Sequence, residues 1–376
     1  MDGSNSLAMR DVEYHLHSQT DLRAHEREGP QIMTQGDGVY VVDAGGTRYL
    51  EAMAGLWNTA LGFSESRLAD AADAQMRRLP YYHTFYHKTP DVCIALAEKL
   101  VTMAPVPMSK AFFTNSGSEA NDSAVKLVWY LNHGRGRPEK RKIISRLRGL
   151  HGVTGISASV TGIPRMHVDF GLPLPGFLHV SCPHRYRGGL PGESEEAFAT
   201  RLAEELDALI VAEGPDTVAA FFAEPVMGAG GVVVPPKGYF EKIQAVLRKH
   251  DVLFVADEVI CGFGRTGEMW GSTTFGMEPD ILTCSKALSS GYFPIAAVLL
   301  RRATRRSPTR PPGTGASGTG SRARGIPWGP RWRWRLSRSS RSGISSAMCA
   351  RWARGCWTGW RGWKGIRWWA RRAASA

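Results

Sequence analysis

The stretch Val252-Leu253-Phe254-Val255-Ala256-Asp257-Glu258 decides the fold, because five consecutive apolar residues end directly at two acids. Short continuous apolar runs are typical of strands that are buried on both faces of a sheet. Similar apolar runs predict the strands Val218–Ala223, Ile281–Thr283 and Ile295–Leu300. Two helices are predicted in the same region, Ser194–Val211 and Gly238–His250. Strands that alternate with helices predict an α/β fold with a mostly parallel central sheet and helices on both faces.

The chain before this region continues the alternation. Its predicted elements are the helices Arg67–Leu79, Pro90–Met103 and Ser118–Leu131, the strands Ala111–Thr114 and Lys142–Ser145, and a hairpin over Gly38–Leu50. The hairpin is predicted from alternating apolar residues around the turn sequence Asp43-Ala44-Gly45-Gly46.

The charge of the chain is distributed unevenly. The net charge of +13 first suggests a nucleic-acid-binding protein. However, 19 of the 47 basic residues lie in residues 301–376, whereas all 34 acidic residues precede residue 281, so residues 1–300 carry a formal charge of −6. The basic character belongs to the tail alone, and we expect no nucleic-acid partner.

Residues 301–376 form a tail rich in Arg, Trp and Gly, which we expect to be non-native and disordered. The tail holds nine of the 12 Trp and has no Val, Phe, Tyr, His, Asp or Glu. A GC-rich gene read in the wrong frame yields such text. With suitable codons for 321–330, reading from the third base gives Ser-Arg-Ser-Gly-His-Pro-Val-Gly-Pro. This favours a frameshift between Leu300 and Ser321, and the alternative is a basic segment that binds RNA or a membrane surface.

Cysteine usage and hydropathy indicate the compartment. The six Cys show no paired spacing, so neither a disulfide framework nor a zinc site is indicated. The N-terminal segment is polar, and the longest apolar run, Tyr292–Leu300, is too short to cross a bilayer. We therefore expect a cytoplasmic protein without a metal site or a membrane partner.

Three further elements carry chemistry. Lys286 lies among small residues between two apolar runs, Asp257 closes an apolar strand, and Ser116-Gly117-Ser118 opens a helix. An amine, a carboxylate and an anion cradle are what a protein needs to hold pyridoxal phosphate. The amine forms the Schiff base, the carboxylate keeps the ring nitrogen protonated, and the cradle takes the phosphate.

Each element also has a purely structural interpretation. Ser116 or Ser118 can be a helix N-cap, with Glu119 in the first turn. Asp257 can form a salt bridge with a cation such as Arg265, and Lys286 can be a solvated surface lysine. The combination of the three, in this order, favours the cofactor site.

The chain resembles the class III, fold-type-I pyridoxal-phosphate aminotransferases, and among them the omega-amino acid or amine:pyruvate transaminases. The resemblance covers about His15 to Leu300. The matching segments are Gly55-Leu56-Trp57, Tyr81–Phe85, Ser116–Glu119, His151-Gly152, Glu224-Pro225, Gly228–Gly231, Asp257–Gly267, Lys286 and Ser289–Tyr292. The resemblance implies three parts: residues 1–65 with the hairpin, as part of a small domain; residues 66–300, as the large cofactor-binding domain; and the tail 301–376, where most of the small domain is missing.

The resemblance also implies roles for single residues. Lys286 would bind the cofactor and move the proton between substrate and cofactor carbons, and Asp257 would pair with the ring nitrogen. Val259 would pack on one ring face. Ser116, Gly117 and Ser118 would contact the phosphate. Leu150, His151 and Glu224 would surround the ring. Trp57 and Phe85 would line the substrate pocket, which in this family often lies at a homodimer interface.

One departure concerns Leu150, which stands where most relatives have an aromatic residue stacked on the ring. Leu150 offers no π-face, so we expect weaker retention of the cofactor.

The expected reaction is a ping-pong transfer of an amino group from an amine or omega-amino acid to pyruvate or another 2-oxo acid. Three alternatives stay open: a truncated, catalytically impaired fragment, a functional basic tail, and a decarboxylase or racemase on the same scaffold. The transaminase is favoured by residues near Asp257, where Ile260 replaces the Gln of ornithine-type relatives. The sequence leaves the amino donor open.

Overall fold

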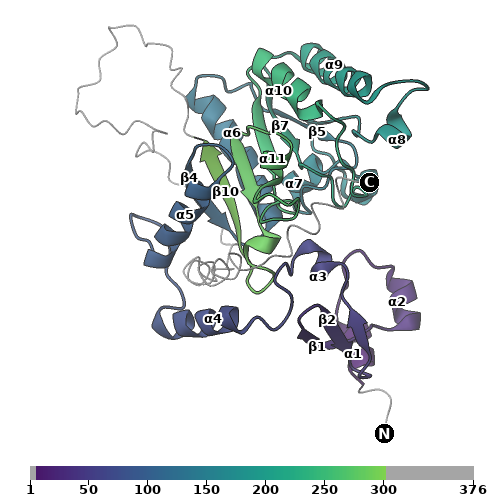
Figure 1. Cartoon of the computed structure of the whole chain (residues 1–376), viewed down its shortest axis with the longest axis vertical. Coiled ribbons are helices and arrows are strands. Elements are labelled where there is room, and N and C mark those ends of the chain that lie inside the picture. The colour runs from purple at the N-terminus through teal and green to yellow at the C-terminus, as the bar shows by residue number, and fades with distance from the viewer. Residues whose placement is uncertain (1–5, 302–376) are drawn as a thin grey trace. The chain divides into compact units, whose positions relative to one another are not determined.

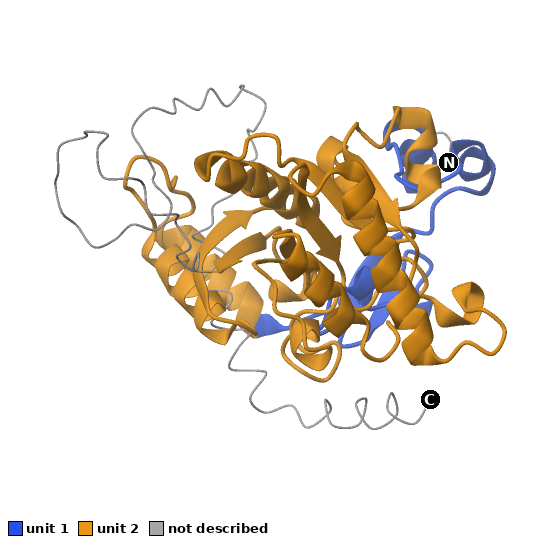
Figure 2. Cartoon of the chain, turned by 90° about the horizontal axis from the view of Figure 1, so that it is seen from above, with its two compact units in different colours: residues 1–66 blue, residues 67–376 orange. Residues whose placement is uncertain are grey.

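The structure is a computed structural model that describes residues 6–301 (Figure 1). The predictions about the tail after Arg301 lie outside the described residues. The chain divides into two compact units, Met1–Ser66 and Arg67–Ala376 (Figure 2). The predicted boundary lay at residues 65 and 66, and the assignment of the first unit to a small domain stays a prediction.

The first unit contains short helices and a small antiparallel sheet. Its elements are α1 (Leu7–Tyr14), α2 (Leu22–Glu28), β1 (Met33–Asp37), β2 (Tyr40–Asp43), β3 (Arg48–Leu50) and α3 (Ala54–Trp57). The sheet has the order β1-β2-β3, and both strand pairs are antiparallel.

The predicted hairpin is confirmed as β2 and β3. Asp43 organises its turn, because Oδ1 accepts hydrogen bonds from the N–H groups of Gly45 and Thr47, both at 2.9 Å. Gly46 has φ +83°, a left-handed conformation that favours glycine. The strand β1 was not predicted, because Met33–Asp37 lacks a clear apolar alternation.

The second unit is an α/β structure. Its strands are β4 (Met108–Thr114), β5 (Lys142–Arg146), β6 (Phe177–Val180), β7 (Val218–Ala223), β8 (Leu253–Asp257), β9 (Ile281–Cys284) and β10 (Ala296–Arg301). Its helices are α4 (Ser66–Arg78), α5 (Asp91–Met103), α6 (Gly117–Gly134), α7 (Gly155–Val160), α8 (Arg185–Gly188), α9 (Glu195–Glu213), α10 (Tyr239–Lys249) and α11 (Gly271–Thr274), with short 3₁₀ turns at Pro164–Met166, Val168–Phe170 and η4 (Lys286–Leu288).

The seven-stranded sheet has the order β4-β10-β9-β8-β7-β5-β6. The strands from β9 to β6 are parallel neighbours, whereas β10 is antiparallel to both β9 and β4. The carboxyl ends of β4, β5, β7, β8 and β9 therefore lie at one edge of the sheet. Ligands of open α/β sheets bind at such an edge.

Two apolar layers enclose the sheet and explain its continuous apolar strands. Phe221 and Phe254 pack with α9 and α10 on one face. Phe222 and Val255 pack with α6 on the other face. Successive strand residues point to opposite faces, so both members of each adjacent pair must be apolar. The predicted mostly parallel sheet with helices on both faces is confirmed (Figure 1).

The predicted elements of the second unit differ little from the observed ones, but the strand β6 and the short helices α7, α8 and α11 were not predicted. The helix predicted over Ser118–Leu131 extends over Gly117–Gly134, and β4 begins three residues earlier than predicted. The strand β6 was missed because it is only four residues long and is the outermost strand of the sheet. Among residues 6–301, no helix has the length and apolarity that crossing a bilayer requires.

Glu258 ties the segment after β8 to the start of α11. Its Oε2 accepts a hydrogen bond from Gly271 N at 3.0 Å, and its Oε1 accepts one from Ser272 Oγ at 2.6 Å. The side chain is buried, and burial raises the pKa of the Glu258 carboxyl from 4.5 to about 7, because the charged form loses its hydration. The hydrogen bonds from Ser272 and Gly271 act in the opposite direction without cancelling this effect.

The raised pKa of Glu258 predicts a pH-dependent free energy of unfolding. The folded state keeps the proton that the unfolded state loses, so the contribution is present below pH 4.5 and is lost as the pH rises through 7. The loss is of the order of 3 kcal/mol. Urea unfolding at a series of pH values should show this fall in the parent chain and in Glu241→Gln, an exposed control, but not in Glu258→Gln. Equal slopes in both variants would contradict the prediction.

The packing of α9 predicts a large difference between two substitutions on one helix. Leu206 has 0% exposure in the core, whereas Val211 is 57% exposed. Leu206→Ala should lower the free energy of unfolding by about 2–5 kcal/mol, because it leaves a cavity. Val211→Ala should change it by no more than about 0.5 kcal/mol. Urea midpoints of the two variants measure the difference, and similar midpoints would show that α9 does not pack as described.

Candidate active site

Five chain segments meet at the carboxyl edge of the sheet. They are the start of α6 after β4, the loop 147–153 after β5, Glu224 after β7, Asp257 at the end of β8, and Lys286 after β9. Two of these contacts are very close. A Cβ added to Gly117 would lie 3.0 Å from Val259 Cγ1 and 3.7 Å from Ser285 Cβ. The sequence segments that carry the predicted cradle, acid and amine are therefore neighbours in space.

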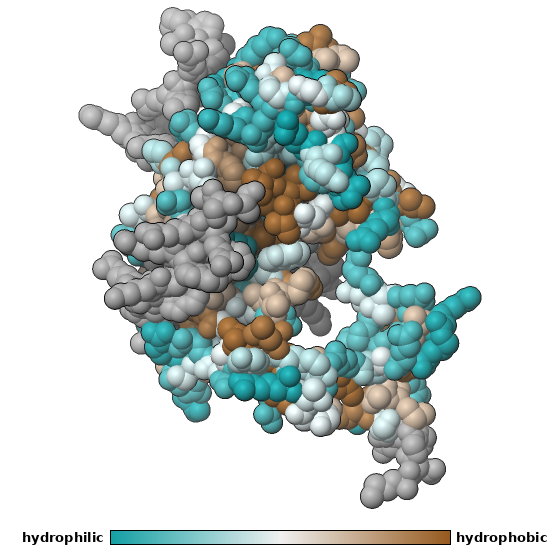
Figure 3. Space-filling view, turned by 45° about the vertical axis from the view of Figure 1, so that its right-hand side comes forward, coloured by the Kyte–Doolittle hydropathy of each residue, from teal (hydrophilic) through white to brown (hydrophobic). Residues whose placement is uncertain are grey.

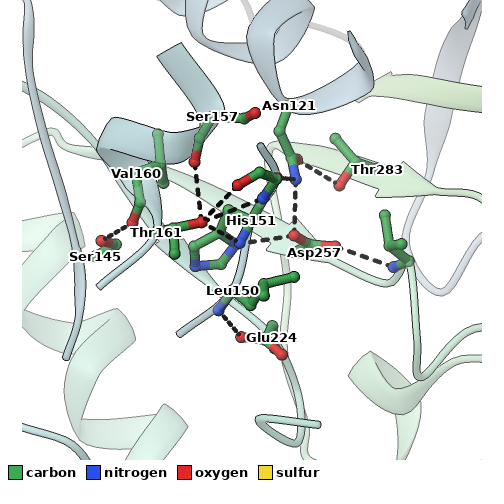
Figure 4. Close-up of polar contacts among 12 residues, drawn as sticks. Asn121, Ser145, Leu150, His151, Ser157, Val160, Thr161, Glu224, Asp257 and Thr283 are labelled. Carbon is green, nitrogen blue, oxygen red and sulfur yellow. Dashed lines mark hydrogen bonds and ion pairs between the residues drawn. The ribbon is translucent and has the colours of Figure 1, made fainter. Parts of the chain in front are cut away.

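Asp257 is at the centre of the polar contacts (Figure 4). Its Oδ2 receives Asn121 Nδ2 and His151 Nδ1, each at 2.8 Å, and its Oδ1 receives the N–H of Val259 at 3.0 Å. The side chain is buried, with 2% exposure for the residue. A carboxylate only accepts hydrogen bonds, so His151 Nδ1 carries a proton in this arrangement. Three donors from three segments hold the carboxylate in one orientation.

Asn121 connects α6 with two strands. Its Nδ2 also donates to the carbonyl oxygen of His151 at 2.6 Å, and its Oδ1 accepts from Thr283 Oγ1 at 2.9 Å. Thr161 supports the same loop, because its Oγ1 accepts the N–H of His151 at 2.8 Å. The sequence analysis did not assign Asn121, Thr161 or Thr283 to the site. The one signal for Asn121 was its position one helical turn after Gly117, on the same face of α6.

The start of α6 has the features of an anion cradle and of a capped helix at once. Ser116 is the N-cap, and its Oγ accepts the N–H of Glu119 at 3.2 Å. The capping interpretation is therefore correct for Ser116. Ser118 Oγ accepts the N–H of Val153 at 3.1 Å, which leaves its hydroxyl proton to donate. Gly117 lets the helix approach Val259 closely, and the first turn directs backbone N–H groups and the positive helix end outward.

The loop after β5 is fixed by Glu224. Glu224 Oε1 accepts the N–H of Leu150 at 2.9 Å, and its Oε2 accepts that of Gly228 at 3.1 Å. Glu224 is 2% exposed, and burial raises the pKa of its carboxyl above the ordinary value. His151 Nε2 is buried and has no hydrogen-bond partner among the residues that the structure describes. This nitrogen is an unsatisfied polar atom near Gly149, whereas the other ring nitrogen, Nδ1, contacts Asp257.

Gly152 allows the loop to lie directly on α6 and α7. Its φ is +144°, and an added Cβ would lie 2.2 Å from Ser157 Oγ and 2.7 Å from Ser118 Oγ. No other residue fits without moving these hydroxyls. Gly152 therefore sets the position of its neighbours Leu150 and His151 relative to the start of α6.

Lys286 follows β9 and begins the turn η4. Its φ is +45°, a strained conformation for a residue with a side chain, and such strain is common at functional sites. Desolvation lowers the pKa of the Lys286 amine, although the negative charges of Asp257 and Glu224 act in the opposite direction. A lowered pKa increases the neutral fraction of the amine, which is the nucleophilic form. The surface-lysine interpretation does not account for this burial.

Trp57 and Phe85 belong to different units, so the structure does not place them relative to each other. Trp57 is partly buried within the first unit, and Phe85 is 57% exposed in the second. Phe85 lies in a segment with three further exposed aromatic residues: Tyr81, Tyr82 and Tyr86. On the face shown in Figure 3, hydrophobic patches lie between hydrophilic areas. The assignment of Trp57 and Phe85 to a substrate pocket stays a prediction.

The site combines a fixed carboxylate, a partly neutral amine and a helix N-terminus at one sheet edge. These groups can hold a cationic ring nitrogen, a carbonyl carbon and a phosphate, respectively. Of the residues predicted for the site, those of the second unit other than Phe85 lie at this edge: Ser116, Gly117, Ser118, Leu150, His151, Glu224, Asp257, Val259 and Lys286.

The sequence is similar to characterised transaminases. Residues 23–319 match the family described as Aminotransferase class-III. The chain is 58% identical over 272 residues to the probable gamma-aminobutyrate transaminase 2, mitochondrial, of Oryza sativa subsp. indica, a match that covers 72% of this chain and 55% of that protein. It is 55% identical to the vanillin aminotransferase of Capsicum annuum, with 72% and 59% covered. The chain spans little more than half the length of these curated relatives.

The fold is also similar to solved structures. The omega transaminase from Pseudomonas jessenii in complex with PMP aligns with a TM-score of 0.78 and 61% identity, over 79% of this chain and 65% of that chain. An omega-aminotransferase from Paracoccus denitrificans aligns with a TM-score of 0.77 and 50% identity, over 79% and 66%.

These matches confirm the predicted fold-type-I architecture and, through the family, indicate pyridoxal phosphate as the cofactor. The chain belongs to the class-III aminotransferases.

Proposed function

We propose that this chain binds pyridoxal phosphate at the carboxyl edge of its sheet and transfers an amino group from an amine or omega-amino acid to pyruvate or another 2-oxo acid. The observation that carries the proposal is the Asp257 carboxylate, held by Asn121, His151 and Val259 N within electrostatic range of the Lys286 amine. Burial of a charged carboxylate raises the free energy of the folded state unless a cation or hydrogen-bond donors compensate the charge.

The residues fit the cofactor in three respects. Asp257 supplies the negative charge for a protonated ring nitrogen, and the hydrogen bond from His151 Nδ1 holds the carboxylate in place. Gly117 and the hydroxyls of Ser116 and Ser118 lie where a helix N-terminus favours a phosphate. Val259 is two residues after Asp257 and contacts Gly117, so its side chain is in a position to cover one face of the ring. On the remaining side, Leu150 offers an apolar contact.

When bound, pyridoxal phosphate supplies an electron sink for charge that develops on the substrate carbon. Three hydrogen bonds hold the Asp257 carboxylate in one orientation, in which it would pair with the ring nitrogen. Lys286 Nζ holds the carbonyl end of the cofactor and later accepts and returns the proton at the substrate carbon. Its lowered pKa increases the fraction of the neutral amine, which is the form that accepts a proton. Glu224 keeps the Leu150 loop in place throughout.

The names of the relatives support the proposed substrate class. The rice protein is named for gamma-aminobutyrate, which is an omega-amino acid, and the Pseudomonas jessenii protein is named an omega transaminase. We propose that Trp57 and Phe85 line the substrate pocket in a homodimer. A cytoplasmic location is part of the proposal, although the names of the rice proteins include mitochondrial.

A second candidate is a truncated and catalytically impaired fragment that arises from a frameshift. The chain covers 55% of the rice relative, and the Arg- and Trp-rich tail begins where the described residues end. Such a fragment can keep the cofactor site of the second unit and still lack turnover. Sequencing of the gene around the codons for residues 300–321 tests it, because an intact reading frame through the tail would remove this candidate.

Lys286→Ala tests the proposed function. We expect it to abolish the visible absorbance that the parent chain gains with pyridoxal phosphate and to lower transamination at least 10³-fold, because the nucleophilic amine is lost. Lys110→Ala removes an exposed lysine of β4 and is the matched control, which should behave as the parent chain.

The two readouts separate the candidates. Absorbance and turnover that both depend on Lys286 support the transaminase. Absorbance that depends on Lys286 without turnover supports the impaired fragment. Parent protein that gains no absorbance, or a Lys286→Ala variant that keeps it, would show that the site does not bind the cofactor as proposed.

Leu150→Tyr should strengthen cofactor retention. An aromatic ring at this position can stack on the cofactor, and such a contact contributes about 0.5–1.5 kcal/mol. The dissociation constant, measured by loss of absorbance during dialysis, should fall about 2- to 10-fold. Leu150→Met, which adds no π-face, is the control. If both variants retain the cofactor like the parent chain, Leu150 does not face the ring.

A further inference from the structure

The N-terminal unit contains a group of ionisable side chains that the proposed reaction does not use. Asp11 lies in α1, His15 is the C-cap of that helix, His17 follows two residues later, and His25 lies in α2. The cysteine spacing indicates no metal site, and no metal site was predicted from these histidines. The structure brings all four side chains together.

The four side chains converge through their polar atoms. Asp11 Oδ1 lies 2.9 Å from His15 Nδ1, and Asp11 Oδ2 lies 2.8 Å from His17 Nε2 and 3.1 Å from His25 Nε2. One ligand atom each from Asp11, His15 and His17 lie within 4.8 Å of one another. One carboxylate thus faces three imidazole nitrogens.

The imidazole rings lie side by side next to the carboxylate, each tilted relative to its neighbour. The ring centroids of His15 and His17 are 4.3 Å apart with an interplanar angle of 46°, and those of His17 and His25 are 4.3 Å apart with an angle of 42°. His25 is 9% exposed and His17 28%, whereas His15 is 66% exposed. The cluster therefore has a shielded side, formed by His17 and His25, and an open side at His15.

The carboxylate is suited to a positive charge. Both of its oxygens face ring nitrogens, Oδ1 that of His15 and Oδ2 those of His17 and His25. Neutral imidazole and ionised carboxylate are the protonation states that bind a metal. Three nitrogens and one oxygen form a ligand set that Zn²⁺ accepts in tetrahedral geometry.

The helices that carry these residues contribute no buried side chain to a core. Neither α1 nor α2 has a buried residue, and no residue between 6 and 66 is fully buried. Small units that cannot build an apolar core are often held by a structural metal. The Asp11–His25 contact joins α1 to α2, so a shared ion would act at the place where packing is weakest.

We propose that Asp11, His15, His17 and His25 form a structural site for a transition-metal dication of the Zn²⁺ type, which crosslinks α1 and α2. In a tetrahedral zinc site the ligand atoms lie about 3.3 Å apart, as follows from bond lengths of about 2.0–2.1 Å. The ligand atoms of Asp11, His15 and His17 already lie within 4.8 Å of one another, and His25 Nε2, 3.1 Å from Asp11 Oδ2, has to move toward them to complete the site. All four ligands belong to the first unit.

A Zn²⁺ titration of the full chain, freed of metal with a chelator and followed by equilibrium dialysis, tests the proposal. We expect one Zn²⁺ per chain and a rise of the unfolding temperature with Zn²⁺ concentration, because the ion binds only the folded state. His17→Ala and His25→Ala should each weaken binding at least tenfold. His133→Ala removes an exposed histidine at the end of α6 and should bind Zn²⁺ as the parent chain does.

Further variants keep the test independent of folding defects. His15 is mostly exposed, so His15→Ala should fold and still weaken binding, and Asp11→Asn keeps the size of the side chain while removing its charge. The double variant His17→Ala with His25→Ala gives the background from other groups of the chain. The proposal is overturned if the parent chain binds no Zn²⁺ above that background, or if His15→Ala and Asp11→Asn both bind as tightly as His133→Ala.

Discussion

The structure of the second unit depends on the placement of one buried carboxylate. Asp257 ends the central strand β8, and its two oxygens accept hydrogen bonds from α6, from the loop after β5 and from its own following backbone. Burial of a charge without partners costs several kcal/mol, so the partners must be in place when the core closes. The contacts of Asn121 with Thr283 and with the His151 carbonyl extend this constraint to β9 and back to β5. Sheet packing and site geometry are therefore parts of one network.

The sequence was sufficient to predict six of the seven strands of the large sheet, because strands buried on both faces leave continuous apolar runs. Val218–Ala223 and the run before Asp257 were assigned correctly for this reason, and the acid at the strand end was recognisable as a ligand-facing residue. The supporting residues were not predictable in the same way. Asn121 contacts Asp257 across 136 positions and Thr283 across 162, and no local pattern reports such contacts. The capping role of Ser116, in contrast, was predictable from the sequence, because its partner Glu119 is only three residues away.

The N-terminal unit follows a different principle. Its residues form helices and a hairpin without a fully buried core, so polar contacts carry more of its stability than in the second unit. Asp11 and His15 are four residues apart on one helix face, which the sequence alone could have shown. The approach of His25 could not be predicted, because it requires the chain reversal between α1 and α2.

The central claim is that Asp257, Lys286 and the start of α6 surround one cofactor. A crystal structure of the full chain grown with pyridoxal phosphate tests this most directly. The account predicts continuous density from Lys286 Nζ to the cofactor, an Asp257 oxygen about 2.8 Å from the ring nitrogen, and the phosphate at the backbone of Gly117 and Ser118. Density for the cofactor at another place, or a ring whose nitrogen points away from Asp257, would contradict the account.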